Sequence, residues 1–90
     1  MTIMYDYLNH KTDLSVRNVE GELIILDRQK GLIHQLNRTA GYIWEQCDGH
    51  STVIGIAHQL AEEFDVSFET AEADVRRFIE QLQELDLLII

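Results

Sequence analysis

The sequence predicts an α+β fold in which a three-stranded antiparallel sheet is followed by three helices. The first half of the chain contains short apolar runs separated by turn residues, a pattern typical of strands. The second half repeats apolar residues at three- and four-residue steps, which is typical of helices that bury one face. Between them, the segment LNRTAGYIWEQCDG at residues 36–49 combines a helix start, an apolar face and a glycine stop.

Length and composition favour one small binding domain. The 90 residues, 46% of them apolar, suffice for a modest single core but not for separate substrate and cofactor lobes. The single cysteine excludes an internal disulfide framework and fits a reducing compartment. No stretch resembles a signal peptide or approaches the length of a membrane span, so we expect a cytoplasmic protein.

Residues 1–13 show neither a helical nor a strand period, and we expect an irregular or mobile arm, or an exchanged segment, ahead of a domain at 14–90. The three strands of the sheet are expected near residues 16–19, 23–26 and 32–36. Glu20-Gly21 closes the first hairpin, and a longer loop ending at Gly31 closes the second. A sheet this small needs a helix on one face.

Each helix is expected to begin at a side chain that can accept a free backbone N–H. The capping residues are Asn37 for the first helix, Ser51 or Thr52 for the second, and Ser67 for the third. The first helix places Trp44 on an apolar face, where it is most simply a core anchor, and Gly49 is expected to close it. The second helix runs to about Phe64.

The third helix has an apolar stripe that we expect to face the core. Its members are Ala71, Val75, Phe78, Leu82 and Leu85. Ile79 lies beside this stripe, on the flank of Glu72 and Arg76, so the apolar face widens there. Two glycines inside helices, Gly41 and Gly55, indicate close packing at their positions. The apolar residues 87–90 are expected to dock on the core or on a partner.

Three strands followed by helices, the last two joined by a tight turn, form a winged helix-turn-helix-like arrangement. A DNA-binding regulator is therefore one candidate function. The charges oppose it, because residues 51–90 carry two basic and nine acidic groups, and DNA affinity depends on Lys and Arg at the phosphates. The acidic surface either keeps the protein soluble or attracts a basic or mixed-charge peptide.

Neither a metal site nor a catalytic group is indicated. The four histidines, at positions 10, 34, 50 and 58, lack the paired spacing of zinc ligands. Cys47 falls on the apolar face of its helix, where thiols are usually inert. The carboxylates of the second and third helices occupy polar positions, and no glycine-rich phosphate loop occurs. We therefore expect a protein that is not an enzyme and needs no cofactor.

Several segments, taken together in order and spacing, resemble the PqqD family of pyrroloquinoline quinone biosynthesis and the wider group of peptide-recognition elements of ribosomal peptide maturation. These segments are Ile25-Leu26-Asp27, LNRTAGYIWEQCDG, Thr52-Val53, Ile56-Ala57, residues 60–66 (LAEEFDV), residues 72–75 (EADV), Phe78-Ile79, Leu82 and Leu87-Leu88. The resemblance covers roughly residues 15–88. It implies a non-catalytic chaperone that binds the leader of a precursor peptide and presents it to a modifying enzyme, often a radical SAM enzyme, or a protease and cyclase in lasso-peptide systems.

The resemblance also implies where the leader would bind. In the family, the leader adds as a strand to the edge of the third strand, in a groove walled by the third helix. The edge residues here would be Leu32, Ile33, His34, Gln35 and Leu36. The wall would come from Glu72, Val75, Arg76 and Ile79. We expect Ile79→Glu to weaken peptide binding and to leave the fold largely intact.

A homodimerising scaffold is a further alternative. The open sheet edge and the apolar residues 87–90 could both be covered by a second copy of the chain.

Overall fold

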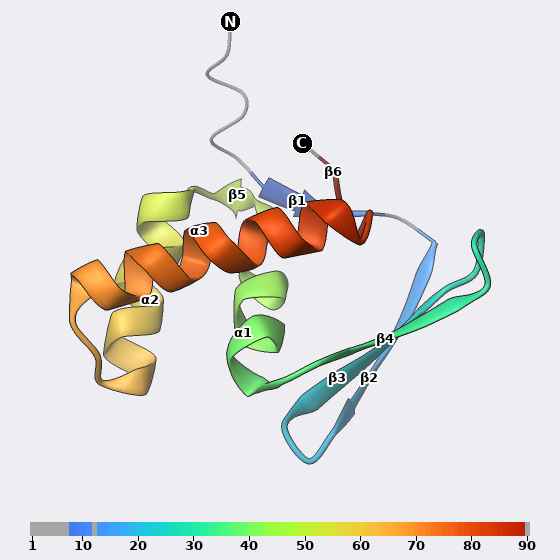
Figure 1. Ribbon diagram of the computed structural model, residues 1–90, viewed down its shortest axis with the longest axis horizontal. Helices are drawn as coiled ribbons and strands as arrows, with labels where there is room; N and C mark the ends of the chain where they lie inside the picture. Colours follow the sequence, from blue (N-terminus) through green and yellow to red (C-terminus); the bar gives the residue numbers. More distant parts are fainter. Residues whose placement is uncertain (1–7, 12, 90) are drawn as a thin grey trace, which may run out of the picture.

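The computed structural model describes residues 8–11 and 13–89, and it contains two small sheets and three helices (Figure 1). The larger sheet is an antiparallel meander in the order β2-β3-β4. Its strands are β2 (Leu14–Val19), β3 (Glu22–Asp27) and β4 (Leu32–Leu36). The helices that follow are α1 (Arg38–Gln46), α2 (Val53–Phe64) and α3 (Phe68–Glu84). This order confirms the predicted α+β fold.

A second sheet, in the order β5-β1-β6, was not predicted. It joins β5 (Asp48–Ser51), β1 (Leu8–His10) and β6 (Leu88–Ile89), which come from three distant parts of the sequence. The prediction of an irregular arm is therefore wrong for residues 8–10, and residues 1–7 and 12 lie outside the described chain. The prediction that the C-terminal segment docks is confirmed for Leu87 and Leu88, which are buried.

The predicted helix starts are confirmed. The side chains of Asn37, Thr52 and Ser67 accept the backbone N–H groups of Ala40, Gly55 and Thr70, respectively. The predicted end of α1 is wrong, since Cys47 is the C-terminal cap and its N–H donates to the Trp44 carbonyl at 3.1 Å. Gly49 has a φ of +88° but belongs to β5, because the chain turns directly from the helix into a strand.

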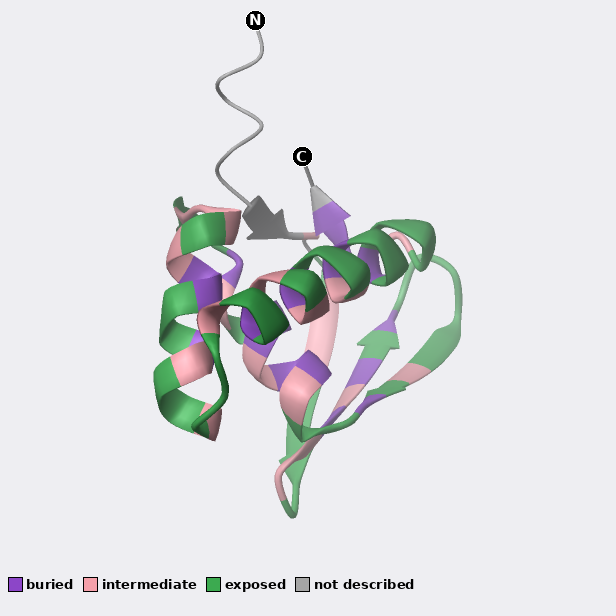
Figure 2. Ribbon diagram, turned by 60° about the vertical axis from the view of Figure 1, so that its left-hand side comes forward, coloured by how far each residue is buried: buried purple, intermediate pink, exposed green. Residues whose placement is uncertain are grey.

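The core lies between the inner face of the larger sheet and the three helices (Figure 2). Leu23 and Ile25 of β3 supply its sheet side. Trp44 is buried, and its indole Nε1 donates to the Leu87 carbonyl at 3.3 Å, which confirms its role as a core anchor. Through this bond α1 is tied to the segment that follows α3.

The apolar face of α3 is rotated relative to the prediction. Ala71, Val75 and Leu82 are buried as expected, but Ile79 is also in the core, with only 7% of its surface exposed. Leu85 is 40% exposed. The buried residues follow one another at steps of four, four and three, which forms one continuous helical face. The predicted stripe contained Phe78 and Leu85, whereas the buried face of the helix contains Ile79.

The burial of Ile79 reverses the expectation for Ile79→Glu. A carboxylate there would lose its hydration without gaining a partner, so we expect loss of more than about 3 kcal/mol of folding free energy. Leu85→Glu, at the 40% exposed C-terminal cap of the same helix, is the control and should cost less than about 1.5 kcal/mol. Thermal unfolding followed by circular dichroism measures both. An Ile79→Glu protein as stable as Leu85→Glu would contradict the core assignment.

The two helical glycines differ in their surroundings. A Cβ on Gly41 would lie 3.1 Å from Leu23 Cγ, whereas a Cβ on Gly55 would meet only the Thr52 hydroxyl at 3.4 Å. Close packing is therefore confirmed at Gly41, where α1 crosses β3. At Gly55 the only neighbour is the Thr52 hydroxyl, so the prediction of close packing is wrong there.

Alanine substitutions should separate these two cases. We expect Gly55→Ala to stabilise the protein by about 0.5–1 kcal/mol, because alanine costs less backbone entropy than glycine in a helix. Gly41→Ala should destabilise it by about 1–2 kcal/mol, because overpacking against Leu23 outweighs that gain. Chemical denaturation of the two variants tests the difference, and equal effects would show that α1 can shift away from β3.

Candidate functional site

Strand β4 forms one edge of the larger sheet. It pairs only with β3 in the described sheet, in a register that sets Leu32, His34 and Leu36 opposite Asp27, Ile25 and Leu23. Because side chains alternate along a strand, these three share the inner face with the core, whereas Ile33 and Gln35 point to the outer face. Ile33 is 71% exposed, Leu32 is 47% exposed and Leu36 is buried. The predicted edge residues are thus adjacent and largely open.

The turn before β4 indicates which backbone groups are free. The Gly31 N–H donates to the Asp27 carbonyl at 2.8 Å, and Gly31 has a φ of +68°. With Asp27 opposite Leu32, these two residues close a four-residue loop, 28–31, and we infer that they form a hydrogen-bonded pair of the ladder. The alternation of an antiparallel ladder then directs the N–H and C=O groups of Ile33 and Gln35 away from β3. Two residues therefore offer unpaired backbone groups along the edge.

The side chains of the edge add polar groups on both faces. His34 is half-buried, and its Nε2 is a buried atom that has no hydrogen-bond partner among residues 8–11 and 13–89. Gln35 donates from Nε2 to Glu22 Oε1 at 2.6 Å on the outer face. Each face of the strand therefore carries one polar side chain, His34 on the inner face and Gln35 on the outer face.

The predicted wall residues of α3 are divided between surface and core. Glu72 and Arg76 form an ion pair at 2.9 Å, with the Arg76 side chain well exposed. Val75 and Ile79 are buried. A peptide approaching this helix would meet the charged pair, whereas the two apolar side chains are buried beneath the helix surface and pack in the core. The structure brings these four residues onto one helix, as their spacing requires.

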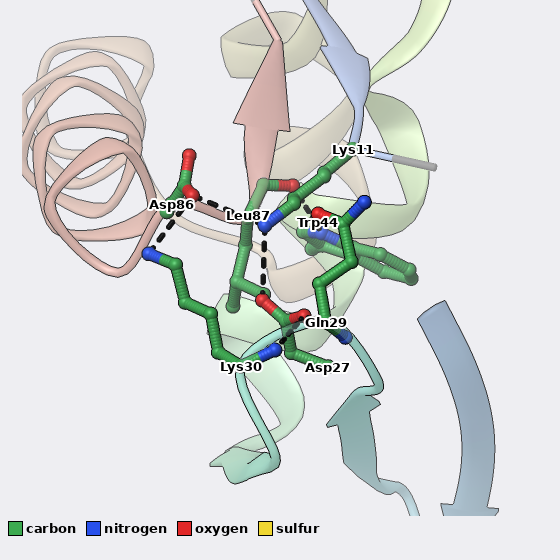
Figure 3. Close-up of polar contacts among 7 residues, drawn as sticks. All are labelled: Lys11, Asp27, Gln29, Lys30, Trp44, Asp86 and Leu87. Carbon is green, nitrogen blue, oxygen red and sulfur yellow. Dashed lines mark hydrogen bonds and ion pairs between the residues drawn. The ribbon is translucent and has the colours of Figure 1, made fainter. Parts of the chain in front are cut away.

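Sequence reasoning missed a cluster of charges at the corner where β3, α3 and the second sheet meet (Figure 3). Lys11 Nζ donates to Asp27 Oδ2 and to Asp86 Oδ2, each at 3.1 Å, and Lys30 Nζ lies 2.9 Å from Asp86 Oδ2. The two residues of each bonded pair are 16 to 75 positions apart, so only the fold brings them together.

The pKa values of the corner groups follow from these contacts. The pKa of Lys11 is raised by its hydrogen bond to Asp27 and by a second hydrogen bond to Asp86. Burial acts to raise the pKa of Asp27, but the bonds from Lys11 and from the Lys30 and Gln29 backbones outweigh it, and this pKa is lowered. Both groups are therefore charged at neutral pH.

The described residues offer no catalytic constellation. Burial, with a smaller contribution from the Asp48 charge, raises the pKa of the Cys47 thiol to about 12, so the thiol stays protonated and unreactive. Residues 8–11 and 13–89 contain no cluster of three potential metal ligands. Within the described part of the chain, no helix is both long and apolar enough to cross a membrane.

Three solved structures share this fold. One is TbiB1 in complex with the TbiA(beta) leader peptide. It has a TM-score of 0.79 and 22% sequence identity, and the match covers 89% of this chain and 93% of that one. A lasso peptide synthetase B1 complexed with a leader peptide has a TM-score of 0.78 and 28% identity over 93% of this chain and 99% of its own. The PqqD truncation of Methylobacterium extorquens PqqCD, described as a stand-alone recognition element for ribosomally made and modified peptides, has a TM-score of 0.75 and 21% identity, covering 92% and 88%.

The sequence itself gives a family assignment. The comparison with curated proteins yields no match. The family model described as coenzyme PQQ synthesis protein D matches residues 22–88, which include β3, β4, all three helices and the start of β6. This match spans most of the chain and agrees with the architecture of the three solved structures, and the protein therefore belongs to the PqqD family.

Proposed function

We propose that this protein recognises the leader region of a ribosomally made precursor peptide and presents it to a modifying enzyme, with no catalysis of its own. The observation that carries the proposal is the combination of an open strand edge at β4 with two structural relatives, at TM-scores of 0.79 and 0.78, that are complexes with leader peptides. Membership of the PqqD family supports the same function.

The leader binds as an added strand along β4. The free backbone groups of Ile33 and Gln35 pair with the peptide backbone and supply affinity that does not depend on peptide side chains. Leu32 and His34 face the inner side, and Leu36 anchors the end of the strand in the core. Alternate leader residues therefore point toward an apolar and imidazole surface, which supplies sequence preference.

The α3 side of the proposed site carries charged side chains at its surface. Arg76 leaves its ion pair with Glu72 and pairs with an acidic residue of the leader. Glu72 can then pair with a basic residue of the leader. Val75 and Ile79 act from the core by holding this face of α3 in place. This division favours leaders in which charged residues flank an apolar strand.

The partner that receives the leader is a modifying enzyme of one of two types. A radical SAM enzyme of the pyrroloquinoline quinone type is the first candidate, because the family model is that of a protein of this pathway. A protease and cyclase pair is the second, favoured by the 28% identity to a lasso peptide synthetase B1. Both act on newly made peptides, so the proposed location is the cytoplasm. The DNA-binding and homodimer alternatives gain no support from these relatives.

Proline substitutions on the two edges of the sheet test strand addition. We expect Ile33→Pro or Gln35→Pro to weaken leader binding at least about tenfold, because each removes a free N–H from the docking edge. Val16→Pro, on the opposite edge strand β2, is the matched control and should leave the affinity within about twofold. The measurement is an amide NMR titration with a synthetic leader peptide, which should shift residues 32–36 and 72–79 in the wild type.

Two outcomes would contradict the proposal. If Ile33→Pro and Gln35→Pro both fold and bind like the wild type, β4 is not the docking edge. If no leader causes shifts but a short DNA duplex does, the family fold has been retained with a different function.

A further inference from the structure

Asp27 is a buried carboxylate that determines the conformation of the turn before β4. Its side chain is fully buried, and it is the only charged residue classed as buried among residues 11 and 13–88. Oδ1 accepts the backbone N–H groups of Gln29 and Lys30 at 3.1 and 3.2 Å, and Oδ2 accepts Lys11 Nζ at 3.1 Å. A buried charge is stable only when it is paired and hydrogen-bonded. The turn therefore depends on Lys11, a residue next to the other sheet.

The end of α3 is joined to the same corner. Asp86 has a φ of +61° and follows the last turn of the helix, where its N–H donates to the Gln83 carbonyl at 2.9 Å. Its carboxylate pairs with Lys11 at 3.1 Å and with Lys30 at 2.9 Å. Lys30 lies in the turn that leads into β4, so one ion pair directly connects this turn to the end of α3.

The backbone of Lys11 completes the junction. Its N–H donates to the Leu87 carbonyl at 3.0 Å, and this carbonyl also accepts the indole of Trp44. The side chain and the backbone of Lys11 thus contact Asp27 of β3 and the residues Asp86 and Leu87, which connect α3 to β6, while Trp44 connects α1 to the same point (Figure 3). In Figure 1, α3 and β4 diverge from this corner, and α1, which contacts both, lies between them.

We propose that Lys11, Asp27, Lys30 and Asp86 are positioning residues for the leader site, and that they hold the start of β4 at a fixed place and register against the end of α3. This inference rests on the proposed function, since β4 is the docking strand. It extends the site beyond the residues that touch the peptide, to a corner that includes a residue from outside the segment matched by the family model.

The physical reason is preorganisation. An added strand gains affinity only if the edge already has its final conformation, because ordering it on binding costs conformational entropy. A strand whose register slips by one residue exchanges its two faces, which would turn His34 outward and Ile33 inward. The turn held by Asp27 fixes this register at the first residue of β4, and the largely buried Lys11, which bonds both Asp27 and Asp86, ties this turn to the end of α3.

Four substitutions test the corner. Asp27→Asn and Lys11→Met remove the buried pair, and Asp86→Asn removes the link to α3 while keeping a residue that tolerates the left-handed conformation. We expect each to weaken leader binding at least about tenfold and to speed hydrogen exchange of the His34 and Leu36 amides, with helix α2 unchanged. Lys11→Arg keeps the charge and should restore affinity to within about threefold of the wild type.

Two controls separate positioning from other causes. Asp13→Asn removes the same charge from an exposed pair with Arg28, 3.9 Å apart, and controls for the change in net charge. Ile56→Val in α2 lowers global stability without touching the corner. Both should leave leader affinity within about twofold of the wild type. Affinity is measured by titration of the full chain with a synthetic leader at a temperature where every variant is folded.

The possible results are distinct. Wild-type affinity and wild-type exchange of the β4 amides in Asp86→Asn would overturn the inference, as would an equal loss of affinity in Ile56→Val. If Asp27→Asn does not fold, Asp86→Asn and Lys11→Arg still decide. If the wild type binds no leader, the proposed function fails, while the exchange rates in β4 continue to test whether the corner positions the strand.

Discussion

A three-stranded sheet in water must bury one face, and most of this structure follows from how that requirement is met. Leu23 and Ile25 supply the buried face of β3, and α1 lies so close to them that a Cβ on Gly41 would be only 3.1 Å from Leu23 Cγ. A helix of nine residues is too short to cover the sheet stably alone. It is held by α3 and by the bond from Trp44 to the Leu87 carbonyl, so the sheet depends on contacts with the distant C-terminal segment.

The same arrangement leaves a sheet edge available. The helices cover the inner face of β3, but among the described residues β4 pairs with β3 alone, and Ile33 remains mostly exposed. Natural proteins usually protect such edges with charges, prolines or bulges, because an open edge invites pairing with other chains. Here β4 itself carries no Lys, Arg, Asp or Glu side chain. An edge left unprotected in this way suits a protein whose proposed partner is an extended peptide.

Local signals in the sequence were sufficient for much of the fold. Asn37, Thr52 and Ser67 cap their helices because a cap depends on residues only three positions away. The meander was predictable for the same reason, since hairpins pair neighbouring segments. Strand β1 was missed because its three residues pair with residues 48–51 and 88–89, and nothing near it in the sequence reveals those partners.

The site was only partly predictable. The sequence located Glu72, Val75, Arg76 and Ile79 on one helix, but the periodicity of an apolar stripe does not fix which way the helix rotates when Phe78, Ile79 and Leu85 compete for the core. Asp27 resembles an ordinary turn residue, and its side chain does accept two turn N–H groups. Its pairing with Lys11 carries no signal in the sequence at all.

The charges of the molecule are arranged in two different ways, and this difference separates structural from recognition roles. At the corner of Lys11, Asp27 and Asp86, opposite charges are close together, partly or fully buried, and satisfied by several bonds, so they hold parts of the fold in place. On α3, Glu72 and Arg76 are near the surface, where an ion pair contributes little and is easily exchanged. A peptide that docks on β4 as proposed could therefore compete for the second pair without disturbing the first, so the start of the proposed docking strand would stay rigid while the surface of α3 stays adaptable.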